Sequence, residues 1–220
     1  SRNKHAISDH FDTAFELQTR LAQDGKTGLL QRINQIVPDE VNLVYVTQPE
    51  ALGLGHAILC AETIVGDEPF AILLADDMIR NDGPGALAQM VDLYRESGAS
   101  VIGVEEIPDE MTTSYGVVGV EVNDQGRSAI HTMVEKPAPQ DAPSRLGVVG
   151  RYVLDPAVFS YLHGVTAGSG GEIQITDALN AQAKQGKVVA CRFRGRRYDC
   201  GSVDGFVQAT NAFYHELDQQ

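Results

Sequence analysis

The chain has 220 residues, and its 30 acidic residues against 17 Lys and Arg give a formal net charge of −13. A field this negative repels nucleic acid and anionic membrane surfaces, so we expect neither as a partner. No apolar run approaches the roughly 20 residues of a membrane-spanning helix, and three cysteines without C-x-x-C spacing favour a reducing cytoplasm.

The N-terminal part has the spacing of amphipathic helices. Apolar residues recur three and four apart over residues 5–21, and a second helical stretch ends before Pro38. VNLVYV (41–46) is short and nearly continuous in apolar character, which predicts a buried strand. GLGH (53–56) leads into another helix, and FAILLADD (70–77) is predicted as a strand that stops at two carboxylates.

Helices and strands continue to alternate along the chain, with a helix predicted over 85–97 and a strand over 100–106. Helices interleaved with buried strands indicate βαβ units, so we expect an α/β fold with a mainly parallel sheet. YGVVGVEV (115–122) and RSAIHTMVE (127–135) flank a turn sequence at 123–126 and predict an antiparallel hairpin. Further predictions are a strand at 147–154, helices from Pro156 and Glu172, a strand at 188–193 and a terminal helix from about Ser202.

Asp76 and Asp77 end a predicted buried strand, and ligands in open α/β sheets gather at the carboxyl ends of strands. A carboxylate there can hold Mg²⁺, which takes one or two protein carboxylates and completes its shell with phosphates and water. The alternative is that one Asp caps the following loop and the other is solvated. Position alone leaves both open for each residue.

The loop at GLGHA (53–57) lies between a strand and a helix, where two glycines let the backbone approach a ligand closely. A lone G-x-G is more often a tight turn than a binding loop. Gln48, just before it, could read a base edge or be an ordinary exposed amide.

Two charged segments follow in the second half of the chain. Glu135 and Lys136 precede Pro137 and could bind a sugar hydroxyl and a phosphate, but the residues alone favour an ordinary ion-rich surface turn. CRFRGRRYDCG (191–201) gathers four arginines, which could attract phosphate, and Asp199, which could join a metal shell. Alternation along a strand would place half of these side chains on the far face, in solvent.

A series of segments in unbroken order, over about residues 5–216, resembles the bacterial UTP–glucose-1-phosphate uridylyltransferases, also called UDP-glucose pyrophosphorylases. The segments are HFDTAFEL (10–17), QPEALGLGHAILCA (48–61), FAILLADD (70–77), YGVVGVEV (115–122), VEKP (134–137), VVGRYVL (148–154), GEIQITDAL (171–179) and YDCGS (198–202). The resemblance implies one Rossmann-like domain over 1–220, a three-layer α/β/α nucleotide-diphospho-sugar transferase. It also implies that UTP and glucose 1-phosphate react to give UDP-glucose and pyrophosphate.

The resemblance assigns a catalytic role to Asp76, Lys136 and Asp199. Asp76 and Asp199 would hold Mg²⁺, and Lys136 would contact the phosphate of the bound sugar nucleotide. The family resemblance also implies a homo-oligomer, built partly through terminal helices.

The same resemblance implies residues that bind the substrates. Gln48 and the backbone near Gly55 would read the uracil, whereas Gly116, Glu135 and Gly150 would contact the glucose.

The family opens with a strand, a G-x-G-T-R loop and a P-K-E segment, which grip the nucleotide phosphates, and this sequence contains none of them. We therefore expect the chain to be N-terminally incomplete relative to the family. The alternative function is a non-catalytic sugar-nucleotide-binding protein or an inactive fragment of the enzyme. An aspartyl-phosphate phosphatase is disfavoured, because its D-x-D/T pattern is absent from residues 75–78.

Overall fold

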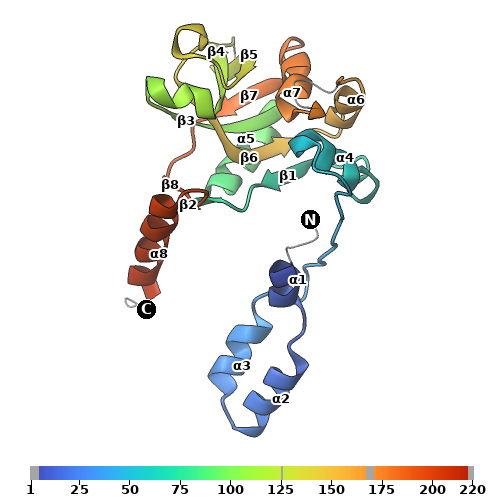
Figure 1. Cartoon of the computed structure of the whole chain (residues 1–220), viewed down its shortest axis with the longest axis vertical. Helices are drawn as coiled ribbons and strands as arrows, with labels where there is room; N and C mark the ends of the chain where they lie inside the picture. Colours follow the sequence, from blue (N-terminus) through green and yellow to red (C-terminus); the bar gives the residue numbers. More distant parts are fainter. Residues whose placement is uncertain (1–4, 125, 167–170, 218–220) are drawn as a thin grey trace. The chain divides into compact units, whose positions relative to one another are not determined.

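The structure, a computed structural model, describes residues 5–124, 126–166 and 171–217, and its contacts divide the chain into two compact units, Ser1–Ala51 and Leu52–Gln220 (Figure 1). The helices of the smaller unit are α1 (His5–Phe11), α2 (Phe15–Gln23) and α3 (Thr27–Asn34). The helices of the larger unit are α4 (Gly53–Val65), α5 (Ala86–Ser97), η1 (Asp109–Ser114), η2 (Pro139–Asp141), α6 (Val158–His163), α7 (Ile175–Ala183) and α8 (Val203–Leu217). Its strands are β1 (Phe70–Leu73), β2 (Asp77–Arg80), β3 (Ser100–Glu106), β4 (Gly116–Val122), β5 (Ser128–Glu135), β6 (Leu146–Leu154), β7 (Val188–Cys191) and β8 (Arg196–Asp199). The prediction of a single domain over 1–220 stays a prediction.

The smaller unit contains short helices, of which α2 and α3 pack together, with the Gln18 side-chain amide donating to the Asn34 Oδ1 at 3.1 Å. The helical pattern over 5–21 is interrupted between α1 and α2, where the Asp12 carboxylate accepts the Thr13 N–H (2.8 Å). A side chain that bonds the adjacent backbone in this way competes with helical hydrogen bonding.

The predicted strand at 41–46 is wrong, because these residues have no regular secondary structure. Their side chains are exposed, Val44 by 59% and Tyr45 by 58%. A strand needs a hydrogen-bonded neighbour, and no other described segment pairs with this one. The apolar pattern alone therefore does not make a strand here.

The central sheet of the larger unit is mixed, with strand order β1-β6-β3-β7-β5-β4. The expectation of a mainly parallel sheet is wrong, because β3–β7 is the parallel pair and the other described pairings are antiparallel. β1 and β3 both run antiparallel to β6, which lies between them. They therefore share a direction, as helix–strand alternation predicts, but β6 separates them.

The predicted hairpin is confirmed as β4–β5, with Gly116 opposite Glu135 and Val122 opposite Ser128. In its turn the Gly126 N–H donates to the Asn123 carbonyl at 2.8 Å. Gln125, within the predicted turn, lies outside the described residues.

Helices cover both faces of the sheet, which confirms the three-layer α/β/α arrangement (Figure 1). Alternate residues of one strand reach opposite cores: Ile102 of β3 packs in the cluster with α4, α6 and α7, and Val101 in the cluster with α5. Within the described ranges, every helix is too short or too polar to cross a lipid bilayer.

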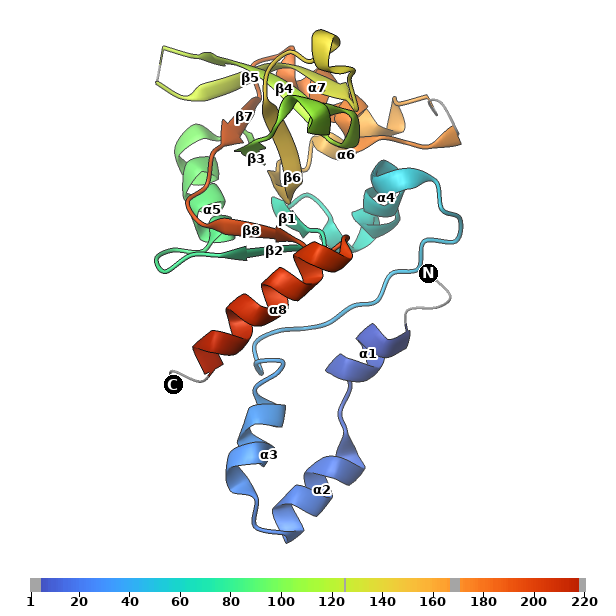
Figure 2. The same ribbon diagram turned by 60° about the vertical axis from the view of Figure 1, so that its left-hand side comes forward.

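A separate two-stranded antiparallel sheet, β2–β8, was not predicted. β2 begins at Asp77, directly after the turn that follows β1, and pairs with β8 so that Asp77 lies opposite Asp199. Helix α8 follows and packs on β8, where the Tyr198 and Phe213 rings are 6.3 Å apart (Figure 2). This small sheet brings together two chain segments that are far apart in the sequence.

Candidate functional site

The carboxylates of Asp76 and Asp199 converge at the end of the β2–β8 sheet. The Cys200 N–H donates to the Asp76 carbonyl at 2.7 Å, which fixes the two backbones side by side. A carboxylate oxygen of Asp76 and one of Asp199 both lie within 4 Å of the point that a Cβ on Gly201 would occupy. The structure thus brings together the two residues that the sequence resemblance singles out as metal ligands.

Asp76 and Asp77 have different environments, and their positions in the sequence alone did not predict this difference. Asp77 is 5% exposed; its carboxylate accepts the Gly150 N–H at 2.7 Å and pairs with Arg197. Asp76 is exposed and borders the cavity described below. Asp77 is therefore an internal counterion, and Asp76 is the carboxylate available to a ligand.

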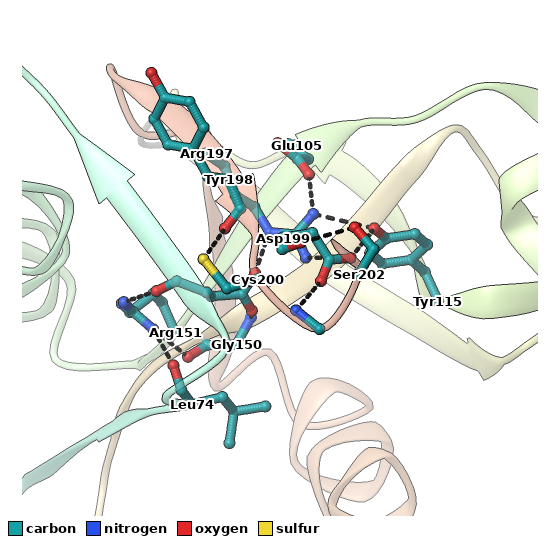
Figure 3. A network of polar contacts seen from close by, with 12 residues as sticks. Leu74, Glu105, Tyr115, Gly150, Arg151, Arg197, Tyr198, Asp199, Cys200 and Ser202 are labelled. Atoms are coloured by element: carbon teal, nitrogen blue, oxygen red, sulfur yellow. Dashed lines mark hydrogen bonds and ion pairs between the residues drawn. The ribbon is translucent and has the colours of Figure 1, made fainter. Parts of the chain in front are cut away.

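Arg197 of β8 is the centre of a buried polar network (Figure 3). Its guanidinium donates to the Glu105 carboxylate (2.6 Å) and to the Tyr115 hydroxyl (3.0 Å), and lies 3.6 Å from the Asp199 carboxylate. Burial lowers the pKa of Arg197, but the contacts with Tyr115, Asp77 and Glu105 outweigh it and raise the pKa above its usual value. Arg197 is therefore a permanent cation in this acidic region.

Two adjoining cavities run along the carboxylate pair and the sheet. A cavity of about 490 Å³ is lined by Asp76, Asp199 and Gly150, among other residues. A smaller cavity of about 160 Å³ is lined by Gly116 and Glu135. The residues common to both linings are Ser114, Tyr115, Val148 and Tyr152. We call the two together the crevice.

The end of the hairpin forms the far wall of the crevice. The Thr176 hydroxyl donates to the Glu135 carboxylate at 2.9 Å, and a Cβ on Gly116 would lie 3.1 Å from the same oxygen. A side chain at Gly116 would therefore crowd Glu135.

Lys136 has a positive φ of 47°, a left-handed conformation that costs free energy in a residue with a side chain. Its N–H donates to the Tyr115 carbonyl at 3.0 Å, and its side chain is exposed. In the described part of the chain its side chain lines neither cavity. Its contact with a phosphate therefore stays a prediction.

Three of the predicted substrate-binding residues, Gly150, Gly55 and Gln48, have different surroundings. Gly150 lines the crevice and packs against Asp77 and Leu74. The Gly55 N–H, at the start of α4, already donates to the Ile173 carbonyl at 2.9 Å. Gln48 belongs to the smaller unit. Uracil reading by Gln48 and Gly55 therefore stays a prediction.

Residues 6–216 match the family model described as nucleotidyl transferase. The chain is 44% identical, over 98% of its length and 77% of the relative's, to a UTP–glucose-1-phosphate uridylyltransferase from Pseudomonas aeruginosa. The chain belongs to this family. Among solved structures it is similar to a UDP-glucose pyrophosphorylase complexed with UDP-glucose, at 42% identity and a TM-score of 0.85, covering 98% of this chain and 79% of the other. It is also similar to a UTP-bound UDP-glucose pyrophosphorylase from Acinetobacter baumannii, at 40% identity and a TM-score of 0.83, covering 94% and 72%.

The positions of Asp76 and Asp199 fit a divalent metal ion held between two carboxylates. Among the described residues, no group of three or more His, Cys, Asp and Glu side chains gathers as a metal site. Mg²⁺ needs no such group, because it is commonly held by one or two carboxylates together with substrate phosphates. Two converging and accessible carboxylates beside a cavity meet that requirement.

Three side chains of the site, Tyr115, Tyr152 and Thr176, were not predicted from the sequence, and Arg197, one of four arginines expected to attract phosphate, instead pairs with Asp77, Glu105 and Asp199. Tyr115, Tyr152 and Thr176 lie within family segments quoted above, and Arg197 directly precedes the segment that holds Asp199. For Arg197 the sequence did offer a signal. Three carboxylates expected close together, those of Asp76, Asp77 and Asp199, repel one another and need a nearby cation.

Proposed function

We propose that this chain transfers the uridylyl group of UTP to glucose 1-phosphate, giving UDP-glucose and pyrophosphate. An oxygen of the sugar phosphate attacks the α-phosphorus of UTP. The bond from that phosphorus to the β-phosphate oxygen breaks, and pyrophosphate leaves. The observation that carries this proposal is one crevice that joins the Asp76–Asp199 pair to Glu135, in a chain 44% identical to a uridylyltransferase.

The crevice residues position two polyanions rather than move protons, which is the usual strategy in phosphoryl transfer. Glu135, held by Thr176, accepts hydrogen bonds from hydroxyls of the pyranose. Gly116 and Gly150 let the backbone lie close to the sugar in this proposal. A Cβ at Gly116 would crowd Glu135, and one at Gly150 would overlap Asp77 and Leu74. Lys136 places its ammonium beside the phosphate of the sugar nucleotide.

Asp76 and Asp199 hold Mg²⁺ in this proposal. When bound, Mg²⁺ neutralises phosphate charge and so allows two anionic substrates to approach each other in an acidic protein. Both carboxylates line the larger cavity, so an ion held between them would face that cavity.

Two broader features belong to the same proposal. The three cysteines, Cys60, Cys191 and Cys200, are free thiols, which suits a reducing cytoplasm.

Helix α8 exposes Val203, by 81%, and Phe206, by 60%, and this apolar surface supports a homo-oligomer formed partly through terminal helices. Light scattering of the full chain tests this, and a monomer at all concentrations would contradict it.

The test of the function uses the full chain with UTP, glucose 1-phosphate and Mg²⁺, and measures release of pyrophosphate. We expect release that depends on both substrates and stops when Mg²⁺ is chelated. Calorimetry with UDP-glucose runs in parallel on the same sample. Binding of UDP-glucose without pyrophosphate release would contradict the enzymatic proposal and support the non-catalytic binding protein.

A further inference from the structure

Arg197 connects the β2–β8 sheet to the central sheet. Its side chain is 9% exposed and forms ion pairs with carboxylates from three strands, Asp77 of β2, Glu105 of β3 and Asp199 of its own strand. The contact with Glu105 is 2.6 Å and that with Asp199 is 3.6 Å. One side chain therefore ties the small sheet, which carries Asp199, to the core of the larger unit.

The hydroxyl of Tyr115 gives Arg197 a second route to Asp199. Arg197 Nη1 donates to the Tyr115 hydroxyl at 3.0 Å, and that hydroxyl donates to Asp199 Oδ2 at 3.4 Å (Figure 3). The other oxygen, Asp199 Oδ1, accepts the Gly201 N–H at 3.0 Å. Both oxygens of Asp199 thus have a directed contact, although its side chain is 46% exposed.

Only a guanidinium can make these contacts together. Nε of Arg197 pairs with Asp77, Nη1 with Glu105 and Tyr115, and Nη2 with Asp199. These contacts use the five N–H donors of the planar guanidinium, which point in fixed directions. Lys has a single ammonium at the end of a flexible chain and cannot make them all at once.

The neighbouring Arg196 provides an internal comparison. Alternation along β8 turns its side chain to the opposite face, where its guanidinium lies over the Tyr198 ring at 4.9 Å. Arg196 is exposed, and among the described residues the ion pairs of Asp77, Glu105 and Asp199 are with Arg197 and not with Arg196. The same strand thus has one solvated arginine and one buried arginine, which the site uses.

We propose that Arg197 is a positioning residue that orients Asp199 for the metal, directly and through Tyr115. The inference rests on the proposed function, because it assumes that Asp76 and Asp199 bind a divalent cation. Arg197 itself contacts neither metal nor substrate in this proposal. The positive charge of Arg197 opposes the binding of a cation. Any gain in metal affinity from Arg197 therefore comes from the orientation that it gives to the Asp199 carboxylate.

The test measures Mn²⁺ binding to the full chain saturated with UDP-glucose, from the paramagnetic resonance signal of free Mn²⁺. Arg197→Lys keeps the charge and removes the fork, so it isolates geometry from electrostatics. We expect the Kd for Mn²⁺ to rise about tenfold, the lower end of the effect of residues that orient metal ligands. Arg196→Lys makes the same chemical change one residue away, and its Kd should match the unsubstituted chain.

Tyr115→Phe is the second variant, because it removes one hydroxyl and leaves the ion pairs of Arg197 with Asp77 and Glu105 intact. We expect about a threefold rise in the Mn²⁺ Kd, the effect of one hydrogen bond. This variant decides the question if Arg197→Lys does not fold, as judged by circular dichroism and thermal unfolding.

The outcomes separate the inference from the proposal beneath it. Failure of the unsubstituted chain to bind Mn²⁺ would overturn the metal assignment, and the inference with it. Normal binding by the unsubstituted chain, together with an unchanged or lower Kd in folded Arg197→Lys and in Tyr115→Phe, would overturn the inference alone.

Discussion

Two adjacent carboxylates at the edge of the crevice have opposite environments. Asp76 is exposed, whereas Asp77 is buried against Arg197 and the Gly150 N–H. The sequence predicted that an acidic residue at this strand end would bind a ligand, and position could not say which one. Burial decides it, and this burial involves Arg197, which is distant in the sequence and is brought to Asp77 by the pairing of β8 with β2.

The pair Asp76→Asn and Asp77→Asn tests this distinction with one chemical change at neighbouring positions. Asp76→Asn should lower kcat/KM by about 100-fold with unchanged stability, because it removes one of the two anionic ligands that we propose for the metal ion. Asp77→Asn should lower the free energy of unfolding by about 3 kcal/mol, because it breaks a buried ion pair. Steady-state kinetics and urea unfolding measure the two effects. Equal losses of stability in both variants would contradict the assignment.

Lys136 combines a predicted role with an unpredicted backbone conformation. The sequence indicated a cation next to Glu135, but nothing in the local pattern predicted its φ of 47°. That conformation is set by the hairpin end, where the Lys136 N–H donates to the Tyr115 carbonyl. Backbone strain of this kind is often retained at functional sites.

Lys136→Ala and Lys136→Gly separate the ammonium from the backbone strain. Both should lose about 100-fold in kcat/KM, since both lack the ammonium that we propose beside the phosphate of the sugar nucleotide. The Gly variant should be about 1 kcal/mol more stable than the Ala variant, because glycine adopts a positive φ without steric cost. Thermal unfolding and kinetics on the same preparations check both. A fully active Ala variant would return Lys136 to an ordinary surface turn.

The arrangement of strands was less predictable than their existence. β3, the hairpin β4–β5, β6 and β7 follow the apolar runs of the sequence closely. The position of β6 between β1 and β3 could not be predicted, because helix–strand alternation fixes direction and not neighbours. The short β2 strand (DMIR) lacks an apolar run and depends on pairing with β8.

Gly150 on β6 is where the central sheet touches the turn before β2, so it reports on that junction. A Cβ there would lie 2.6 Å from Leu74 and closer still to the Asp77 carboxylate. Gly150→Ala should therefore lower the free energy of unfolding by about 2 kcal/mol through overpacking. Gly85→Ala is the control, since no atom lies within 4 Å of its added Cβ. Equal stability of the two variants in urea unfolding would contradict the close packing at this junction.

The larger unit as a whole is held by two apolar cores, one on each face of the central sheet. The alternation of helices and strands predicted an α/β fold, whereas the three layers were expected from the family resemblance. The smaller unit was less predictable, since the apolar segment 41–46 is exposed. Tyr152 of β6 lies in the core that packs under α4, α6 and α7, and it also lines the crevice. A change at Tyr152 therefore affects both the stability of the fold and the site.

The alkaline stability of the molecule should reflect Tyr152. Burial, followed by the charges of Glu135 and Asp77, raises the pKa of its phenol above 10.0. A group whose pKa is higher in the folded state contributes its full stability below pH 10.0, and this contribution is lost as pH rises toward the folded pKa. Tyr152→Phe should therefore weaken the fall in unfolding free energy above pH 10.0, measured by urea titration. An identical alkaline decline in both proteins would contradict this.

The proposed function requires that sugar nucleotide and metal meet in the crevice. The direct measurement is a crystal structure of the full chain with UDP-glucose and Mn²⁺, which gives an anomalous signal at the ion. We expect the ion between the carboxylates of Asp76 and Asp199, and the pyranose beside Glu135. An ion bound elsewhere, or a sugar nucleotide outside the crevice, would contradict the account.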